Sequence, residues 1–295
     1  MTEAIPEKLG IIAGRGAFPR LLAEGARKQG VRQIVAVAFR GETDPVIEKA
    51  ADQVVWLHVG QLEAMLAAFR QRGIAQAVMA GQIAPSNLFH IRLDTRALAI
   101  LARLKDRNAR TIFGAIGDEL HAIGVELLPA YRFMEDTMPA PGLLSRRGPT
   151  DRERLDIELG LQAAKATSAL EIGQTVVVKE GVILAVEAFE GTDETVLRAG
   201  KLGGGGAVVV KVARQGHDMR YDIPIVGLRT LAVLKKIKAA VLAVEARRTI
   251  LLEREQITEA ADKQNLAFIA VEVADKGKDN SKRQMPDSKE ISNTK

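Results

Sequence analysis

The sequence predicts an α/β protein with an N-terminal Rossmann-like domain, built on a parallel sheet, and a second, distinct α/β domain. Three observations support this. The chain has 295 residues, of which 47% are hydrophobic, enough for about two domains at ~150 residues each. Short apolar runs alternate with amphipathic ones through the first half, as in a mostly parallel sheet. The second half adds hairpin-like pairs of β-rich runs.

The first domain is expected to cover residues 1–135. It opens with a strand, a glycine turn and a helix in "KLGIIAGRGAFPRLLAEGARKQG". Further strands are expected in "QIVAVAF", "QVVWLHVG" and "QAVMAGQI", and a helix in "QLEAMLAAFRQRG". Ligands of such sheets bind at the carboxyl ends of the strands. One rim should therefore carry Gly14, Arg15, Gly16, Gly60, Gln61, Gly81 and Gln82.

The turn "AGRGAFP" matches the dinucleotide fingerprint incompletely, because Pro19 stands where the third glycine belongs. Glu42 and Asp44 come late for the usual ribose-binding acid. Three interpretations stay open: an anion-binding turn at a helix N-terminus, a purely structural turn, and a nicotinamide dinucleotide site.

The region from Leu93 to about Leu127 is expected to be helical but interrupted at "IFGAIGDEL". Gly114 and Gly117 would mark turns there, and Asp118 would cap the next helix, "ELHAIGVELL". Residues 136–149 are rich in proline and glycine, which indicates a linker.

The second domain is expected to cover residues 150–273. Its helices should lie in "DRERLDIELGLQAAKATSAL", "LRTLAVLKKIKAA" and "REQITEAADKQN". "QTVVVKEGVILAVEAF" predicts a hairpin that turns at "KEG". "GAVVVKVA" and "LAFIAVEV" should be strands, and "AVLAVEA" with "RTILLE" a further strand pair. The polar tail, residues 274–295, is expected to be disordered.

Composition narrows the function classes. The absence of cysteine excludes disulfides, thiolate catalysis and Cys-ligated zinc. Aromatic residues make up only 4%, too few for a base-stacking surface, so no nucleic-acid partner is expected. A net charge of +5 suits anionic partners, although solubility alone would also explain it. No signal peptide and no apolar run of about 18 residues is evident. A cytoplasmic protein with peripheral membrane contact is therefore expected.

Acidic residues follow the predicted hairpin in "VEAFEGTDETVLRAG". Glu187, Glu190 and Asp193 lie there with Thr192, and carboxylates in such a loop can hold Mg²⁺. The same residues equally suit a turn in which Thr192 or Asp193 caps the following helix. The next loop, Gly203 to Gly206, is either a flexible loop or a phosphate-binding nest. Lys211 after it could reach an anion or be a solvated strand-end lysine.

Asp218, Arg220 and Asp222 alternate in "GHDMRYDIPIVG". In an extended segment they would share one face. Two carboxylates around a guanidinium would suit a metal or a general base beside a phosphate-binding cation. A surface ladder of charges is the alternative. Glu245 follows a buried run beside two arginines; it is either a paired or a catalytic carboxylate.

Several of these stretches, taken in order from Leu9 to Glu272, resemble the UDP-2,3-diacylglucosamine pyrophosphatases of the LpxI type. They are "GIIAGRGAFP", "EIGQTVVVKEGVILAVEAFEGTDETVLRAG", "GGAVVVKVARQGHDMRYDIPIVGLRT", "AVLAVEARRTILLE" and "ADKQNLAFIAVE". The resemblance implies a Mg²⁺-dependent hydrolase of lipid A biosynthesis. Such an enzyme releases UMP and 2,3-diacylglucosamine 1-phosphate (lipid X) on the cytoplasmic face of the inner membrane.

The family's catalytic aspartate lies in an R-F/Y-D-x-P-x-x-G motif, which here assigns the role to Asp222. Asp222, Asp218 and Asp193 are the metal ligands we expect. Substrate contacts are expected from Thr192, Lys211, Arg220 and the glycine rim, Gly14, Arg15, Gly16, Gly81 and Gln82. Arg247 stands where the family usually has glycine. A homodimer is a further expectation. A non-catalytic sugar-nucleotide binding protein is the alternative function, and an oxidoreductase a more distant one.

Overall fold

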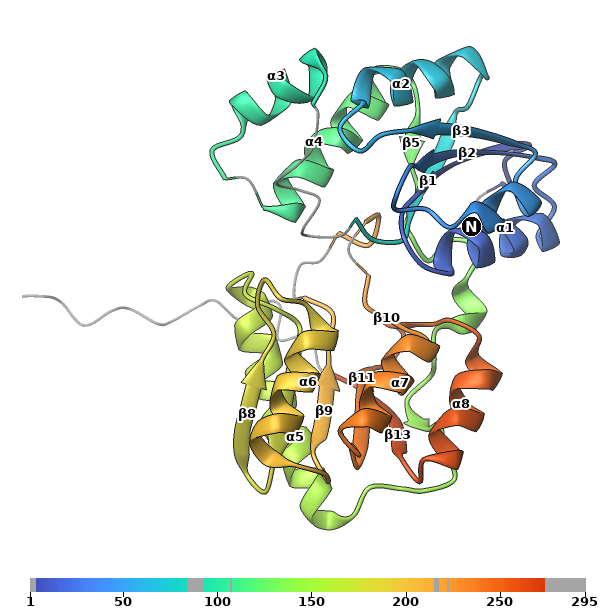
Figure 1. Ribbon diagram of the computed structural model, residues 1–295. Helices are drawn as coiled ribbons and strands as arrows, with labels where there is room; N and C mark the ends of the chain where they lie inside the picture. The colour runs from blue at the N-terminus through green and yellow to red at the C-terminus, as the bar shows by residue number, and fades with distance from the viewer. Residues whose placement is uncertain (1–3, 84–92, 107, 215–217, 222, 274–295) are drawn as a thin grey trace, which may run out of the picture.

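Two lobes make up the computed structural model, which describes residues 4–83, 93–106, 108–214, 218–221 and 223–273. Figure 1 shows the N-terminal lobe above, in blue to green, and the C-terminal lobe below, in yellow to red. A green segment and an orange segment run between them (Figure 1). The α/β class and the two distinct domains predicted from the sequence are confirmed.

The sheet of the N-terminal lobe is parallel throughout its described strands, in the order β3-β2-β1-β4-β5. Strand order reverses beside β1, so β1 and β4 flank the switch point where such sheets bind ligands. The strands are β1 (Lys8–Ala13), β2 (Gln33–Phe39), β3 (Gln53–Leu57), β4 (Gln76–Ala80) and β5 (Glu126–Leu127). The helices are α1 (Phe18–Lys28), α2 (Leu62–Gln71), α3 (Thr95–Arg103) and α4 (Ala109–Ala122), with the 3₁₀ turns η1 (Pro45–Lys49) and η3 (Glu135–Thr137).

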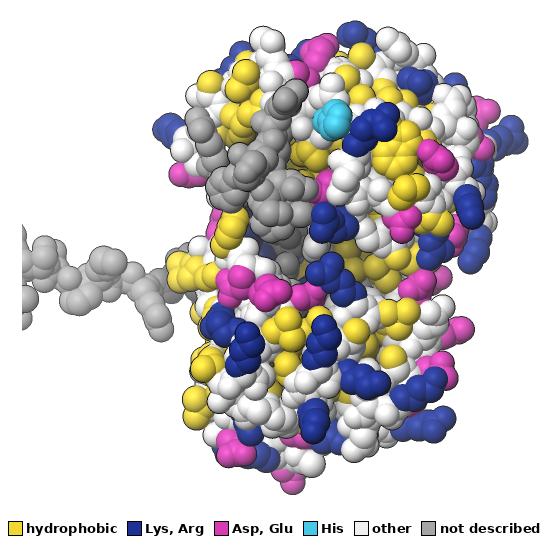
Figure 2. Space-filling view, viewed as in Figure 1, with side chains coloured by type: hydrophobic (Ala, Val, Ile, Leu, Met, Phe, Trp, Pro, Cys, Tyr) yellow, Lys and Arg dark blue, Asp and Glu magenta, His cyan; other side chains and the backbone are white. Residues whose placement is uncertain are grey.

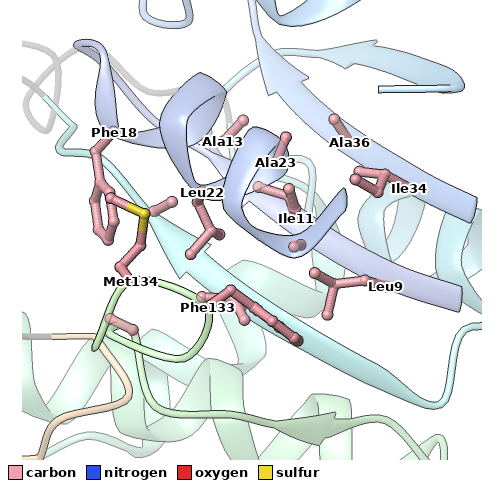
Figure 3. Packing of buried hydrophobic residues seen from close by; sticks show 14 of the residues in the cluster. Leu9, Ile11, Ala13, Phe18, Leu22, Ala23, Ile34, Ala36, Phe133 and Met134 are labelled. Carbon is pink, nitrogen blue, oxygen red and sulfur yellow. The ribbon is translucent and has the colours of Figure 1, made fainter. Parts of the chain in front are cut away.

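Alternate residues of each strand pack on opposite faces of this sheet, as the period of a strand requires. Leu9 and Ile11 of β1 are buried with Leu22 of α1 on one face. Val35 of β2 packs with Phe69 of α2 on the other. Figure 3 shows the first cluster, in which the side chains of α1 meet those of the strands.

One sequence prediction is wrong in this lobe. Helix α4 runs through Gly114 and Gly117 without a turn, so Asp118 lies inside the helix and caps nothing. The cap is Asn108, whose Oδ1 accepts a hydrogen bond from the Thr111 amide at 2.9 Å. The last residues of the predicted helix form β5, because they pair with β4. Helix packing overrides the cost of two glycines there.

The C-terminal sheet is mixed, in the order β6-β13-β11-β9-β7-β8 among the described strands. Strands β9, β11 and β13 are parallel, and β6, β7 and β8 run antiparallel to their neighbours. The strands are β6 (Gly142–Leu143), β7 (Thr175–Lys179), β8 (Val182–Val186), β9 (Val208–Lys211), β11 (Val241–Glu245) and β13 (Ala267–Val271). The helices are α5 (Asp151–Ala169), α6 (Thr192–Gly203), α7 (Leu228–Lys236) and α8 (Arg254–Lys263).

Helix α5 covers one face of this sheet and the other three helices cover the opposite face. Val208 and Val210 of β9 pack with Ala164 of α5. Val209, between them, packs with Leu234 of α7. The predicted hairpin is confirmed as β7 and β8. Strand β6 lies inside the stretch 136–149 that was expected to be a linker.

A small parallel ribbon links the lobes. It consists of β10 (Ile225–Val226) and β12 (Ile250–Leu251). The expected pairing of "AVLAVEA" with "RTILLE" is therefore wrong, since β11 lies in the large sheet and β12 pairs with β10. Ile223 and Leu252 flank the ribbon and are buried in the same cluster as α1. Ile250 belongs to that cluster too, whereas Val226 and Leu251 are buried in the core of the C-terminal lobe, so the ribbon joins the two cores.

Candidate active site between the lobes

Polar contacts join the two lobes next to both sheets. Arg20, in the first turn of α1, pairs with Glu253 of the C-terminal lobe at 3.1 Å. The amide of Ala130 donates to the carbonyl of Met219 at 2.6 Å. Figure 2 shows acidic and basic side chains side by side along this boundary. A ligand at either sheet edge would lie next to the other lobe.

Two glycines make the N-terminal rim compact. The amide of Gly14 donates to the carbonyl of Ala80 at 2.7 Å, and Arg15 bridges Gln82. A Cβ added at Gly14 would lie 2.7 Å from the carbonyl oxygen of Gln82. Gly81 adopts a φ of 91°, in the left-handed region. Gly14 and Gly81 are therefore required by the close approach of two backbones, whatever else they bind.

The structure brings Gly14, Arg15, Gly81 and Gln82 together where β1 and β4 end, on one rim of the sheet. Gly60 and Gln61 follow β3 and lie beyond β2 on the same edge. Arg15 Nε donates to the buried Glu42 at 3.2 Å while its side chain remains 46% exposed. Glu42, considered in the sequence as a ribose-binding acid, holds this arginine at the rim.

The C-terminal edge carries a buried polar group that we call the Lys211 cluster: Thr175, Glu187, Thr192 and Lys211. Lys211 Nζ donates to Thr192 Oγ1 at 3.2 Å. That hydroxyl donates to Glu187 Oε1 at 2.9 Å and lies 3.3 Å from the Thr175 hydroxyl. Lys211 is only 6% exposed. In the described part of the chain no carboxylate lies within ion-pair distance of its ammonium group, so it has the capacity to bind an anion.

Thr192 occupies the first position of α6, and Gly191 precedes it as the cap. The expectation that Thr192 or Asp193 caps this helix is wrong, since the Thr192 hydroxyl donates to Glu187 instead. Asp193 forms an ion pair with Arg229 at 2.6 Å, and Glu190 one with Arg198 at 2.6 Å. The Arg198 hydrogen bond lowers the pKa of Glu190.

Glu245 resolves as a structural carboxylate. It is 2% exposed, and its Oε2 accepts from Lys165 Nζ at 2.7 Å and from the amide of Ala213 at 2.8 Å. Ala213 lies two residues after the end of β9. The sequence left open whether Glu245 is a paired or a catalytic carboxylate, and the structure shows the paired one.

Asp218 and Arg220 lie in a turn, not in the extended segment that the sequence predicted. The amide of Tyr221 donates to the carbonyl of Asp218 at 3.3 Å, which closes the turn. Asp218 and Arg220 still interact, because the guanidinium donates to both carboxylate oxygens at 2.6–3.1 Å. Asp222, the expected catalytic residue, lies outside the described residues.

The surroundings of this turn shift the pKa values of three of its side chains. Hydrogen bonds from Arg220 lower the pKa of Asp218, and the carboxylate in return raises the pKa of Arg220. Burial raises the pKa of Tyr221. All three groups therefore keep their ordinary charge states at neutral pH.

Tyr221 and α4 are contacts that sequence reasoning missed. The Tyr221 hydroxyl donates to the carbonyl of Arg110 at 3.5 Å, and its ring lies 5.8 Å from that of Phe113. Gly114 of α4 lies beside this tyrosine, since a Cβ added there would lie 3.6 Å from its hydroxyl, an ordinary contact distance. The sequence signal for this contact was the glycine content of α4, which the sequence analysis interpreted as turns.

Nothing in the described ranges gathers three or more Asp, Glu or His side chains into a group able to hold a metal ion. Asp218 is engaged by Arg220, and Asp193 by Arg229. The expected ligands are thus not assembled into a cation cage by the described residues.

Sequence models of two domains match most of the chain: the LpxI N-terminal domain over residues 8–137 and the LpxI C-terminal domain over residues 140–269. The UDP-2,3-diacylglucosamine pyrophosphatase LpxI of Caulobacter vibrioides is 28% identical over 276 residues, which cover 90% of this chain and 98% of that protein.

Solved structures overlap more loosely. The biotin carboxylase domain of a 2-oxoglutarate carboxylase from Hydrogenobacter thermophilus is 14% identical, with a TM-score of 0.28 over 68% of this chain and 41% of that one. N5-carboxyaminoimidazole ribonucleotide synthetase is 12% identical, with a TM-score of 0.28 over 68% of this chain and 46% of that one. Overlap at this level does not bear on the site.

None of the helices in the described ranges has the length and apolar character needed to cross a bilayer. Because the LpxI N-terminal and C-terminal domain models match consecutive stretches that together make up most of the sequence, the chain belongs to the LpxI family.

Proposed function

We propose that this chain is a hydrolase that splits the pyrophosphate bond of UDP-2,3-diacylglucosamine, releasing UMP and 2,3-diacylglucosamine 1-phosphate for lipid A biosynthesis. The supporting observation is the Lys211 cluster. It presents a buried ammonium group, bonded to a hydroxyl, at the lobe boundary of a chain whose relative is named as this pyrophosphatase. A doubly charged pyrophosphate is a suitable partner for such a group.

Each side of the boundary has a separate task in this proposal. Lys211 and Thr192 bind oxygens of the pyrophosphate, and Arg220 neutralises charge that develops as the bond breaks. Gly14, Arg15, Gly16, Gly81 and Gln82 bind the nucleotide portion at the rim of the N-terminal lobe.

Asp222 is the proposed catalytic residue. It accepts a proton as the oxygen of a water molecule bonds to phosphorus, and the bridging phosphorus–oxygen bond breaks to give two phosphate monoesters. In the sequence it directly follows Tyr221, whose hydroxyl donates to the carbonyl of Arg110 in α4.

Mg²⁺ belongs to the proposal as an ion that screens phosphate charge and lowers the pKa of bound water. The described carboxylates do not fit a dedicated cage, since Asp218 and Asp193 are held by arginines. The phosphate oxygens of the substrate and Asp222 are the ligands that we propose.

Exposed apolar side chains support contact with an acylated substrate at a membrane surface. Leu170 is 72% exposed and Ile172 46%. Both lie in the loop before β7, whose first residue pairs with Lys211. We propose peripheral association with the cytoplasmic face of the inner membrane through this edge. The homodimer stays a prediction from the sequence.

Product analysis tests the function. Purified protein is incubated with UDP-2,3-diacylglucosamine and Mg²⁺, and the products are resolved by mass spectrometry and ³¹P NMR. We expect equimolar UMP and 2,3-diacylglucosamine 1-phosphate, loss of turnover with a chelator, and recovery on adding Mg²⁺. Saturable binding without products would instead support the non-catalytic sugar-nucleotide binding protein. Neither binding nor products would reject both.

A further inference from the structure

Glu171 joins three side chains from both lobes. Its Oε1 atom accepts from Arg110 Nε at 3.0 Å and from a terminal nitrogen of Arg214 at 3.2 Å. Its Oε2 atom accepts from Asn108 Nδ2 at 2.6 Å. Asn108 and Arg110 begin α4 in the N-terminal lobe, while Arg214 follows β9 in the C-terminal lobe. One carboxylate therefore connects the lobes directly.

The backbone of Glu171 is unusual. Leu170 caps α5, and Glu171 follows it with a φ of 60°, in the left-handed region. This position after a helix is normally taken by glycine, and sometimes by asparagine, because a Cβ is disfavoured there. Glutamate is disfavoured at such a position, and here its carboxylate contacts three side chains.

Two described parts of the chain meet the first turn of α4. Arg214, after β9, is joined to it through Glu171, which accepts from both Arg214 and Arg110. Tyr221 donates to the carbonyl of Arg110, the same residue whose side chain Glu171 binds. Arg214 and Tyr221 are thus each connected to the first turn of α4.

We propose that Glu171 is a positioning residue that holds the first turn of α4 against Arg214 of the C-terminal lobe. Because Tyr221 contacts the same turn of α4, Glu171 also sets the place of the neighbouring Arg220. The link to substrate rests on the proposed function, whereas the link to lobe placement does not. The ribbon of β10 and β12 also joins the lobes, by apolar packing, so loss of Glu171 should loosen their relative placement without separating them.

Two glycine variants separate this role from a purely structural one. Glu171→Gly removes the carboxylate and relieves the left-handed turn. Glu180→Gly is the matched control, because Glu180 also has a left-handed φ, 51°, in the β7–β8 turn. The side chain of Glu180 forms no ion pair within the described part of the chain. Both variants should keep or raise the melting temperature.

The chain contains no cysteine, so paired spin labels can be introduced without background. Ala122→Cys on α4 and Glu158→Cys on α5 report the distance between the lobes. We expect Glu171→Gly to broaden and lengthen the distance distribution and Glu180→Gly to leave it unchanged. High salt should broaden the wild-type distribution, because the partly exposed ion pairs are screened.

Kinetics give the second readout. Glu171→Gly should raise KM for UDP-2,3-diacylglucosamine roughly fivefold, as expected for losing about 1 kcal/mol of exposed ion pairing, with kcat little changed. An unchanged distance distribution in folded Glu171→Gly would overturn the proposal, and so would a change shared by Glu180→Gly. If the wild-type protein turns over no substrate, the distance measurement alone decides, and the proposed function fails separately.

Discussion

The ammonium group of Lys211 lies 3.2 Å from the hydroxyl of Thr192, which in turn donates to Glu187. A buried ammonium normally needs a direct carboxylate partner. Here no carboxylate among the described residues lies within ion-pair distance of Lys211, and Glu187 is linked to it only through the Thr192 hydroxyl. An incoming phosphate would compensate the charge of Lys211.

Lys211→Met tests this relationship. The variant keeps most of the side-chain volume and removes a buried charge, so the melting temperature should stay equal or rise. We expect kcat/KM for UDP-2,3-diacylglucosamine to fall about a hundredfold, the scale of losing one preorganised donor to a phosphoryl oxygen. Lys201→Met, at an exposed position of α6, is the control and should behave as wild type. Normal kcat/KM in folded Lys211→Met would remove Lys211 from the site.

The ion pair of Asp218 with Arg220 should give a defined pH dependence of stability. Arg220 lowers the pKa of Asp218 in the folded protein below the ordinary value of about 3.9. The stabilisation is therefore complete above that ordinary value and is lost as the pH falls through the folded pKa.

Denaturant unfolding of wild type and Asp218→Asn measures this dependence. We expect the difference in free energy of unfolding to be constant from about pH 5 to about pH 9 and to shrink below about pH 4. A difference that instead changed near neutral pH would point to another titrating group.

Asp222→Ala should lower kcat by about a hundredfold or more, the usual effect of losing a general base. Its melting temperature and substrate binding should be retained. Asp218→Ala should have a smaller effect, because both carboxylate oxygens of Asp218 already accept hydrogen bonds from Arg220. Asp193→Ala should change kcat least, since its carboxylate pairs with Arg229. If Asp222→Ala turned over normally while Asp193→Ala did not, the catalytic assignment would move to Asp193.

Much of the fold could be predicted from local patterns. Strands such as Gln33–Phe39 are short apolar runs bounded by polar residues, and their ends matched the structure. The incorrect predictions are all at places where residues distant in sequence determine the local structure. Glycine 114 indicated a turn, yet packing of α4 keeps it helical. Ile250 and Leu251 formed a strand whose partner, β10, lies over twenty residues away in sequence.

The candidate site was only partly predictable for the same reason. Lys211 and Thr192 were identified separately. The hydrogen bond between them depends on how α6 packs against β9, which the sequence does not reveal. Glu171 carried no sequence signal, because its three partners come from separate elements. A left-handed backbone angle at a glutamate is visible only in three dimensions.

Gly114 lies inside α4, where the sequence predicted a turn, so its replacement tests whether this helix is continuous. A Cβ at this position would meet only the Tyr221 hydroxyl, at an ordinary contact distance of 3.6 Å. Alanine in a helix interior is favoured over glycine by about 1 kcal/mol. Gly114→Ala should therefore raise the melting temperature by ~2–4 °C.

Gly14→Ala provides the opposite case in the same lobe. Its Cβ would lie 2.7 Å and 2.8 Å from backbone atoms of Gln82, which cannot move without separating β1 from β4. Overpacking of this kind costs about 1–3 kcal/mol, so the melting temperature should fall. Thermal unfolding followed by circular dichroism measures both variants. If Gly114→Ala were destabilising by a similar amount, residue 114 would lie in a turn that requires glycine, and the continuous α4 described here would be wrong.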